Sequence, residues 1–384
     1  MKKNIIFGAG AFGKVALEEI GSDKVDYFID NNKLKHGQTF LGKTIISLEE
    51  AAKHKDEYHV VIASLYSASM IKDLEKYDIT DYEVHVQKVH GFFETDELIV
   101  NPYENSPGAE TEKEWNESFR IELGKKGVYD EVERIYQKNN LFEHVEVETV
   151  NRCNGVCSFC PVNKTIDPRE YHVMSEELFH SIVDQLDELD YSGRFTTFSN
   201  NEPLLDDRII EFNRYAREHL PKARIHLFTN GTLLTLEIFK QLIPLLDELV
   251  IDNYQQELHL IKTCQVIADY CEEHPELKKK VTIVLRKPQE ILTTRGGNAP
   301  NRKEIITYDK ERCILPFKQL IIRPDGKISL CCNDAVGKFS LGDVNKERIL
   351  DIWNGPRFDM VRKSLYEGRE NWGNCKFCDT FFTG

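Results

Sequence analysis

The sequence predicts an α/β protein with more than one domain. Short apolar segments typical of buried strands alternate with segments whose apolar residues recur at helical spacing. This alternation is typical of parallel sheets with helices on their faces. The length, 384 residues, exceeds that of one ordinary domain, so two or three domains are expected. Hydrophobic residues make up 41% of the chain, enough to form the cores of such domains.

The first domain is expected in residues 1–90. An apolar strand is followed by the glycine turn Gly8-Ala-Gly10-Ala-Phe-Gly13 and a helix, and the next strand ends at Asp30. A glycine turn at a helix start leaves backbone N–H groups free for a phosphate, and an acid at the end of the second strand suits a ribose. We expect Gly8, Gly10, Gly13 and Asp30 to bind a nucleotide. A role in packing or docking alone is the alternative.

Residues 91–142 are more polar than the rest of the chain. They contain Pro102 and the Pro107-Gly108 pair, which interrupt regular structure. We interpret this segment as a linker with one helix over residues 127–142.

Residues 143–300 are predicted to form an incomplete parallel barrel. One of its helices is expected to begin at Ser175, a capping residue followed by an acidic first turn. A parallel barrel places its active site at the C-terminal ends of the strands. The tail, residues 301–384, is predicted to be a small α+β domain with short strands, turns and clustered cysteines. The candidate barrel strands are residues 145–150, 193–199, 224–230, 248–253 and 281–286.

Three cysteines follow the first barrel strand as Cys153-x3-Cys157-x2-Cys160. Three thiolates are one short of the four that fill a [4Fe–4S] cluster or a zinc site. An iron without a protein thiolate can bind a substrate and pass it an electron. The alternative is a structural zinc site completed by a distant residue such as His172.

This spacing, with Phe159 before the last cysteine, resembles the radical S-adenosylmethionine (SAM) superfamily over residues 143–300. The resemblance implies a partial (β/α)6-type barrel and a [4Fe–4S] cluster whose open iron binds SAM. It also implies cleavage of SAM to a 5′-deoxyadenosyl radical, which abstracts hydrogen from a substrate.

The resemblance extends to candidate SAM contacts. The segment SNNEPLLD resembles the Gly-Gly-Glu-Pro segment that binds the SAM amino group, with Glu202 as the matching acid. Here Asn200 and Asn201 replace the small residues. The other candidates for contact with SAM are Phe159, Asn230, Asp252 and Asn253 at strand ends, and Arg286 as a fork for the SAM carboxylate.

Four further cysteines form the tail pattern Cys313-x12-Gly326-x4-Cys331 and Cys375-x2-Cys378. The first pair flanks a predicted hairpin around Gly326, and a predicted helix over residues 346–368 precedes the last pair. Four thiolates fill a cluster or a zinc ion, and their spacing alone does not choose between the two. The pattern resembles the shortened, single-cluster form of the SPASM domain, called twitch. That resemblance implies one auxiliary [4Fe–4S] cluster, suited to electron transfer.

The remaining three cysteines have simpler interpretations. Cys332, next to a candidate ligand, is either a buried bystander or a proton or hydrogen-atom donor. Cys264 and Cys271 stand one heptad apart on a predicted helix and are expected to be small buried hydrophobic residues. Ten cysteines without a secretory signal indicate metal or redox sites rather than disulfides.

Charge and hydropathy exclude several classes of function. The net charge of −14 argues against general nucleic-acid binding and against docking on an anionic membrane. No segment approaches the roughly 18 uncharged apolar residues of a membrane-spanning helix. The N-terminal segment is interpreted as a strand rather than a signal peptide, so we expect a cytoplasmic protein.

The function expected from these features is a two-electron oxidation of a sugar, aminocyclitol or nucleotide-sugar by a radical SAM enzyme. Enzymes with a twitch tail include aminocyclitol alcohol dehydrogenases, and the first 90 residues resemble small Rossmann-like domains of bacterial sugar-modifying enzymes. Two alternatives stay open: radical modification of a peptide or protein, and a zinc-stabilised nucleotide-binding or scaffold protein. A small-molecule substrate and an electron donor such as flavodoxin or ferredoxin are the expected partners.

Overall fold

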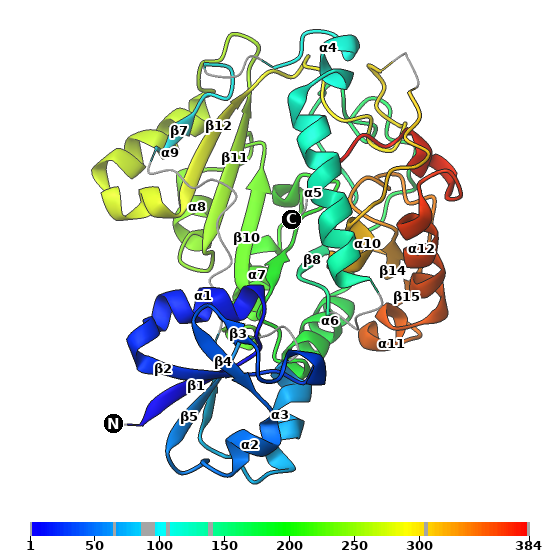
Figure 1. Cartoon of the computed structure of the whole chain (residues 1–384). Helices are drawn as coiled ribbons and strands as arrows, with labels where there is room; N and C mark the ends of the chain where they lie inside the picture. Colours follow the sequence, from blue (N-terminus) through cyan, green and yellow to red (C-terminus); the bar gives the residue numbers. More distant parts are fainter. Residues whose placement is uncertain are drawn as a thin grey trace. The chain divides into compact units, whose positions relative to one another are not determined.

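The structure is a computed structural model that describes residues 2–63, 67–85, 97–104, 108–136, 141–302 and 306–381 (Figure 1). The chain divides into two compact units, Met1–Val89 and His90–Gly384. In the part of the chain that is described, no helix is long and apolar enough to cross a lipid bilayer.

The first unit is a six-stranded sheet in the order β3-β4-β2-β1-β5-β6, with β3 antiparallel and the other strands parallel. Because successive side chains of a strand face opposite ways, Ile5 and Phe7 of β1 join one core cluster and Ile6 joins another. The sheet therefore has an apolar core on each face. Its elements are β1 Lys3–Phe7, α1 Ala11–Ile20, β2 Val25–Ile29, β3 Thr39–Phe40, β4 Lys43–Ile46, α2 Leu48–Ala52, β5 Tyr58–Ile62, α3 Ser67–Glu75 and β6 Tyr82–Val84.

The second unit is built on a nine-stranded sheet in the order β15-β14-β13-β8-β9-β10-β11-β12-β7. The strands from β13 to β7 are parallel, and β14 and β15 are antiparallel. This arrangement confirms the predicted α/β fold with a parallel barrel sheet. The barrel elements are β8 His144–Val147, α6 Glu176–Glu188, β9 Arg194–Thr196, α7 Ile209–His219, β10 Arg224–Thr229, α8 Leu236–Leu242, β11 Glu248–Tyr254, α9 Lys262–Glu273 and β12 Val281–Arg286.

The tail continues the barrel sheet. Its strand β13 pairs in parallel with β8, so that Gln319 lies beside His144 and Ile322 beside Val147. The predicted hairpin around Gly326 is confirmed, because β13 and β14 pair antiparallel on either side of it. The tail elements are α10 Leu315–Lys318, β13 Gln319–Ile322, β14 Lys327–Ser329, β15 Gly342–Asp343, α11 Ile349–Trp353 and α12 Pro356–Glu367.

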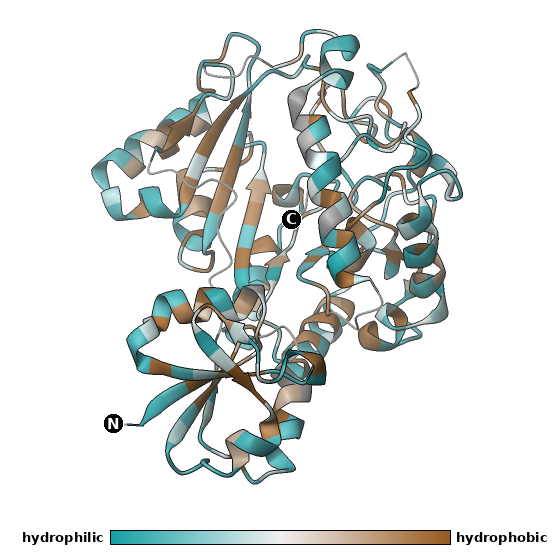
Figure 2. Cartoon of the chain, in the orientation of Figure 1, coloured by the Kyte–Doolittle hydropathy of each residue, from teal (hydrophilic) through white to brown (hydrophobic). Residues whose placement is uncertain are grey.

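The barrel strands have an apolar outer face and a polar inner face. The outer residues belong to the main hydrophobic core together with the apolar sides of the helices, and the strands are correspondingly brown in Figure 2. Two of them are Val145 and Val147, which alternate with Glu146 along β8. The buried polar residues of the inner face include Glu146, Thr196, His226, Glu248 and Thr282. This polar interior leads up to the strand ends where the cluster loop lies.

Two local predictions need correction, and a third is confirmed. The segment 346–368, which we expected to be one helix, is two helices, α11 and α12, because Pro356 opens the second as its first residue. The linker contains β7 Ile99–Val100, α4 Glu112–Asn116 and α5 Phe119–Ile135. Its helix therefore begins earlier than residue 127, and residues 137–140 lie outside the described part. The predicted cap Ser175 is confirmed: its hydroxyl accepts a hydrogen bond from the N–H of Leu178 at 3.2 Å.

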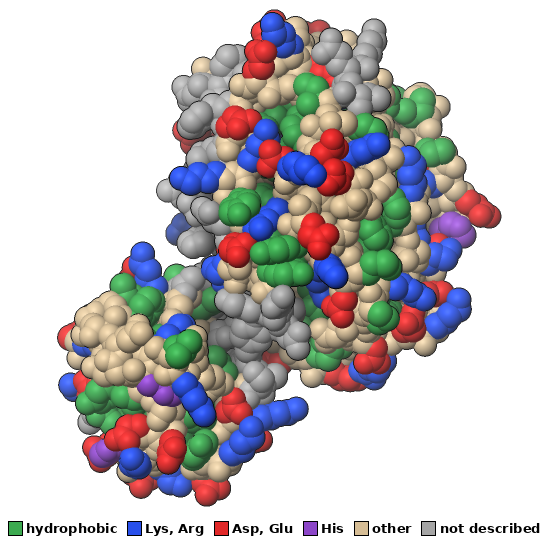
Figure 3. Space-filling view, turned by 45° about the vertical axis from the view of Figure 1, so that its right-hand side comes forward, with side chains coloured by type: hydrophobic (Ala, Val, Ile, Leu, Met, Phe, Trp, Pro, Cys, Tyr) green, Lys and Arg blue, Asp and Glu red, His purple; other side chains and the backbone are tan. Residues whose placement is uncertain are grey.

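The surface carries both signs of charge. On the face shown in Figure 3, Lys and Arg side chains of the second unit are interspersed with Asp and Glu side chains.

We predict that Gly13→Ala destabilises the first unit, because a Cβ at position 13 would lie 1.9 Å from the carbonyl oxygen of Gly8. Overpacking of this kind costs roughly 1–3 kcal/mol. Gly10→Ala is the matched control, since a Cβ there meets nothing within 4 Å. Hydrogen exchange of β1 and β2 in the full chain should accelerate in the first variant only. Equal exchange in the two variants would contradict the close approach.

Candidate active site

The three clustered cysteines lie in the loop after β8. The side-chain amide of Asn163 donates to the carbonyls of Cys157 and Cys160 at 3.1 and 3.0 Å. The N–H of Lys164 donates to the carbonyl of Gly155 at 2.9 Å. The loop is therefore held by its own hydrogen bonds.

Gly155 leaves room between two of the thiols. A Cβ at this position would lie 3.3 Å from the sulfur of Cys153 and 3.9 Å from that of Cys157. The N–H of Gly155 also donates to the Cys153 sulfur at 3.3 Å. A larger residue would fill the space beside these two sulfurs, so the loop forms a cradle next to its thiols.

Burial makes these thiols weak acids. It raises the pKa of Cys153 to about 11 and that of Cys157 to about 12, and the neighbouring thiol of Cys160 adds to both shifts. Bound iron would offset the free-energy cost of forming these buried thiolates, because a cation stabilises the thiolate form. Among the described residues no three His, Cys, Asp or Glu side chains are arranged to hold a single metal ion. A [4Fe–4S] cluster needs no such convergence, since each thiolate binds a different iron.

A cavity of about 130 Å³ opens beside the cluster loop. Its walls come from the loops at the C-terminal ends of the first four barrel strands, where a parallel barrel places its chemistry. The cavity brings together most of the predicted SAM contacts with several residues that the sequence did not single out. The lining residues are Cys153, Gly155, Cys157, Phe159, Cys160, Val162, Asn163, Phe198, Ser199, Asn200, Asn201, Glu202, Phe228, Thr229, Asn230, Asp252, Tyr254 and Arg295.

Glu202 is the most constrained acid in this cavity. Its carboxylate accepts hydrogen bonds from the N–H groups of Leu204 and Asn230 and from the hydroxyl of Thr229, at 3.2, 2.8 and 2.7 Å. Burial nevertheless raises the pKa of Glu202 to about 7. A cationic group such as an ammonium would stabilise the charged form, which fits the predicted contact with the SAM amino group.

Two predicted contacts lie outside the cavity lining. The side chain of Asn253 spans the next loop: its amide donates to the carbonyl of His259, and its oxygen accepts from the N–H of Ile261. Arg286 lies on the inner face of β12, with its Nε 3.3 Å from an oxygen of Glu290. Contacts of Asn253 and Arg286 with SAM remain predictions.

The arginine that does line the cavity is Arg295, which sequence reasoning missed. Its guanidinium donates to the side-chain oxygen of Asn200 at 2.9 Å. The preceding residue, Thr294, is anchored to the tail: its N–H and hydroxyl donate to Asp379 at 2.7 and 3.0 Å. Arg295 and Gly296 have positive φ angles of 49° and 62°. The Arg-Gly-Gly turn was the signal in the sequence that could have revealed this residue.

A buried acid lies behind the cavity wall. Ser199, a lining residue, donates its hydroxyl proton to a hydrogen bond with Glu146 at 2.6 Å. Glu146 is 7% exposed, and burial raises its pKa to about 7 against the effect of the nearby Arg295. Sequence reasoning missed this pair because Glu146 lies within the strand that precedes the motif.

A buried arginine fixes the loops that carry these residues. Arg169 pairs with Glu148 at 2.9 Å and donates to the backbone carbonyls of Asn151 and Asn200, both at 2.9 Å. It therefore joins the loop after β8 to the loop after β9.

The tail cysteines form a second group. The pKa of Cys331 is raised by burial and by its neighbouring thiols, those of Cys332, Cys313, Cys375 and Cys378. The four predicted ligands therefore lie near one another, as a [4Fe–4S] cluster requires. Cys332 is next to them, and its carbonyl accepts a hydrogen bond from Asn200 at 3.0 Å. A catalytic role for Cys332 remains a prediction.

The predicted nucleotide turn of the first unit follows β1. Both oxygens of Asp30 are in use: they accept from the N–H groups of Ala9 and Asn32 at 3.2 and 2.8 Å and from the Lys35 amino group at 2.7 Å. Asp30 thus fixes the turn that contains Gly8 and Gly10.

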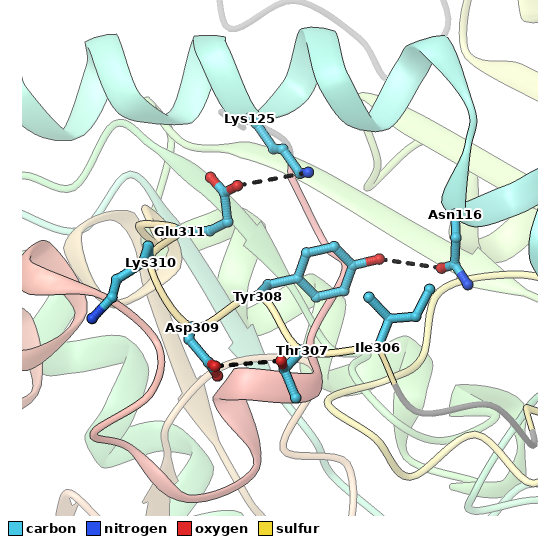
Figure 4. A pocket seen from close by; sticks show the side chains of 8 residues that line it. All are labelled: Asn116, Lys125, Ile306, Thr307, Tyr308, Asp309, Lys310 and Glu311. Atoms are coloured by element: carbon cyan, nitrogen blue, oxygen red, sulfur yellow. Dashed lines mark hydrogen bonds and ion pairs between the residues drawn. The ribbon is translucent and has the colours of Figure 1, made fainter.

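A second hollow, of about 400 Å³, opens elsewhere on the second unit and contains none of the predicted site residues. Figure 4 shows that its polar groups face one another: Lys125 points to Glu311, at 3.6 Å, and Tyr308 donates to Asn116 at 3.1 Å.

Comparison with known proteins finds a family match for each of the two regions that contain clustered cysteines. The radical SAM superfamily matches residues 147–254, and the SPASM domain, an iron–sulfur cluster-binding domain, matches residues 313–379. This chain therefore contains a radical SAM domain and a SPASM domain. The match confirms the predicted cofactors, SAM and [4Fe–4S] clusters, and the thiols of the two sites fit them.

Two relatives of this radical SAM enzyme resemble it over most of their own length. The S-adenosyl-L-methionine-dependent 2-deoxy-scyllo-inosamine dehydrogenase of Niallia circulans is 28% identical over 242 residues, which are 63% of this chain and 94% of that protein. The crystal structure of BtrN in complex with AdoMet and 2-DOIA has a TM-score of 0.56 and 26% identity. It covers 64% of this chain and 96% of BtrN.

Replacing Cys153, Cys157 and Cys160 together with Ala should abolish formation of 5′-deoxyadenosine, because the cluster that cleaves SAM loses its ligands. Iron content of the anaerobically reconstituted enzyme should fall by one four-iron cluster, while the tail cluster remains.

The matched control is Ala at Cys264 and Cys271, which are buried in the core on α9. This control should keep both its iron and its SAM cleavage. Continued SAM cleavage by the triple variant under strong reductant would overturn the ligand assignment.

Proposed function

We propose that this radical SAM enzyme oxidises a hydroxyl group of an aminocyclitol or a related sugar to a carbonyl. The curated relative, a 2-deoxy-scyllo-inosamine dehydrogenase, supports this substrate class. The observation that carries the proposal is the pairing of β8 with β13. β8 leads into the three-thiol loop, and β13 lies between Cys313 and Cys331 of the tail. Two redox sites on neighbouring strands suit a reaction made of two one-electron steps.

The protein's own part in this reaction is to accept a proton. When bound, the cofactors supply a radical that takes a hydrogen atom from the carbon and an acceptor for the remaining electron. The hydroxyl proton must then leave for a carbonyl to form. Ser199 lines the cavity and is hydrogen-bonded to Glu146. Ser199 can take the substrate proton while giving its own to Glu146, and the carboxylate of Glu146 then becomes a neutral carboxylic acid.

The surroundings of Glu146 suit a proton acceptor near neutral pH. The charged and titratable groups that face it are Arg295, Glu148, His144 and Cys332. Burial lowers the pKa of His144 to about 3, so that ring adds no positive charge. Glu146 therefore changes charge at about pH 7.

Incubation of the reduced enzyme with SAM and a panel of aminocyclitols, sugars and nucleotide-sugars tests the proposal. At least one should lose two hydrogen atoms, with one 5′-deoxyadenosine formed per product, as mass spectrometry can measure. Replacing Cys375 and Cys378 with Ala should keep SAM cleavage and stop formation of the oxidised product, since the electron then has no acceptor. Oxidation at the wild-type rate by that variant, or modification of peptides alone, would refute the proposal.

The rate of product formation should fall as the pH is lowered through about 7, because protonated Glu146 cannot accept a proton. Above that pH the carboxylate is charged and the rate should level off. Glu146→Gln should lower the rate by roughly 10²-fold or more and remove this pH dependence.

The matched control is Glu148→Gln. Glu148 lies two residues on and burial also raises its pKa to about 7, but its carboxylate pairs with Arg169. This variant should keep the pH dependence. If Glu148→Gln loses the pH dependence and Glu146→Gln keeps it, Glu146 is not the acid responsible.

We also infer that the first unit is a Rossmann-like nucleotide-binding domain. The glycine turn follows the strand that has parallel neighbours on both sides, β2 and β5, and it leads directly into α1. The amino group of Lys35 lies beside this turn and donates to the carbonyl of Ala9 at 2.9 Å. A flavodoxin or ferredoxin as electron donor stays a prediction.

A further inference from the structure

Arg369 is a buried cation in the tail. It follows the end of α12 in the sequence, and it is 1% exposed. Its nitrogens donate to the backbone carbonyls of Arg312, at 3.1 and 2.8 Å, of Thr380, at 2.9 Å, and of Cys378. The guanidinium also lies over the ring of Phe381, 4.2 Å from its centre. All three of its nitrogens are therefore engaged by neutral groups.

Over the described ranges, Arg369 has no acidic partner at ion-pair distance, since no Asp or Glu oxygen lies within 4.0 Å of it. The buried carboxylate near the chain end, Asp379, pairs with Arg302 at 3.1 Å. A buried charge without compensation is costly. A negative group nearby would therefore stabilise Arg369.

The cysteines of the tail are near Arg369 and would be negative as thiolate ligands of bound iron. Arg369 lowers the pKa of Cys313 and of Cys375, against the larger effect of burial. Its hydrogen bonds end on the carbonyl of Cys378 itself and on that of Arg312, the residue before Cys313. Arg369 therefore lies among the ligands of the tail cluster, and four bound thiolates would offset its charge.

We propose that Arg369 raises the reduction potential of the auxiliary cluster and so makes it a better electron acceptor. Reduction adds negative charge to the cluster, and a fixed positive charge nearby stabilises the reduced form. The effect is strong here because the site is buried and little screened by water. Charge, hydrogen bonding and solvent exposure are the general determinants of such potentials. The origin of the electron, a substrate radical, rests on the proposed function.

The test is a redox titration of the auxiliary cluster by electron paramagnetic resonance. The full chain carries Ala at Cys153, Cys157 and Cys160, so that only the tail cluster is observed. Arg369→Gln should shift the midpoint to a more negative potential. At a fixed potential, the ratio of reduced to oxidised cluster should fall at least tenfold. For a one-electron couple this equals about 59 mV. The measurement needs neither SAM nor substrate, so its outcome is independent of the proposed function.

Two variants serve as controls. Arg369→Lys keeps the positive charge and should keep a potential near that of the wild type. Arg312→Gln removes a charge next to Cys313, but Arg312 pairs with the largely exposed Glu133 and its loss should shift the potential much less.

The outcomes separate tuning of the potential from a structural role. An unchanged potential in Arg369→Gln with a full cluster would overturn the proposal. If Arg369→Gln does not hold the cluster, the result for Arg369→Lys is used instead. A Lys variant that binds the cluster with the wild-type potential supports the proposal. Failure of both variants to hold the cluster would make Arg369 a structural clamp, and the proposal would fall.

Discussion

The parallel pairing of β13 with β8 is the constraint on which the arrangement of the second unit depends. The two strands run side by side over four residues, with Ile321 beside Glu146 and Ile322 beside Val147. One strand belongs to the barrel and the other to the tail, yet they share one sheet. A slip of a single residue would turn every side chain of β13 to the opposite face. The register therefore fixes the cysteines of the tail relative to those of the barrel.

Buried charges dominate the interior near this pairing, and the protein handles them in three ways. Arg169 is paired with Glu148 and holds two loops. Glu146 and Glu202 have hydrogen-bond donors, but burial still raises their pKa values to about 7. Among the described residues, Arg369 has only neutral partners at contact distance. The first case stabilises the fold, whereas the other two leave charge to be balanced by cofactor or substrate.

Local sequence patterns predicted the features that residues close together in the sequence determine, such as motifs and helix starts. The cysteine spacings predicted the two domains that the family comparisons confirm, and Ser175 predicted a helix start. Two misses were also local and readable: Thr111 and Glu114 form a capping box at the start of α4, and Pro356 divides the tail helices. The strand period could have separated two candidates, since adjacent residues of β11 face opposite ways. Asp252 lines the cavity, while Asn253 bonds to the next loop.

The Arg-Gly-Gly sequence indicates a turn at Arg295, but local patterns could not predict that this arginine reaches the cavity. Its position depends on a left-handed turn and on hydrogen bonds between residues 85 positions apart. Arg369 is a similar case, because its partners Arg312 and Cys378 come from different parts of the tail. Such long-range contacts leave no periodic trace in the sequence.

The contact between Thr294 and Asp379 couples two regions that are far apart in the sequence. Asp379 directly follows Cys378, and Thr294 directly precedes the arginine of the cavity. A shift of the segment after Cys378 would therefore displace the anchor of Arg295, so the shape of the cavity depends on the conformation of the tail.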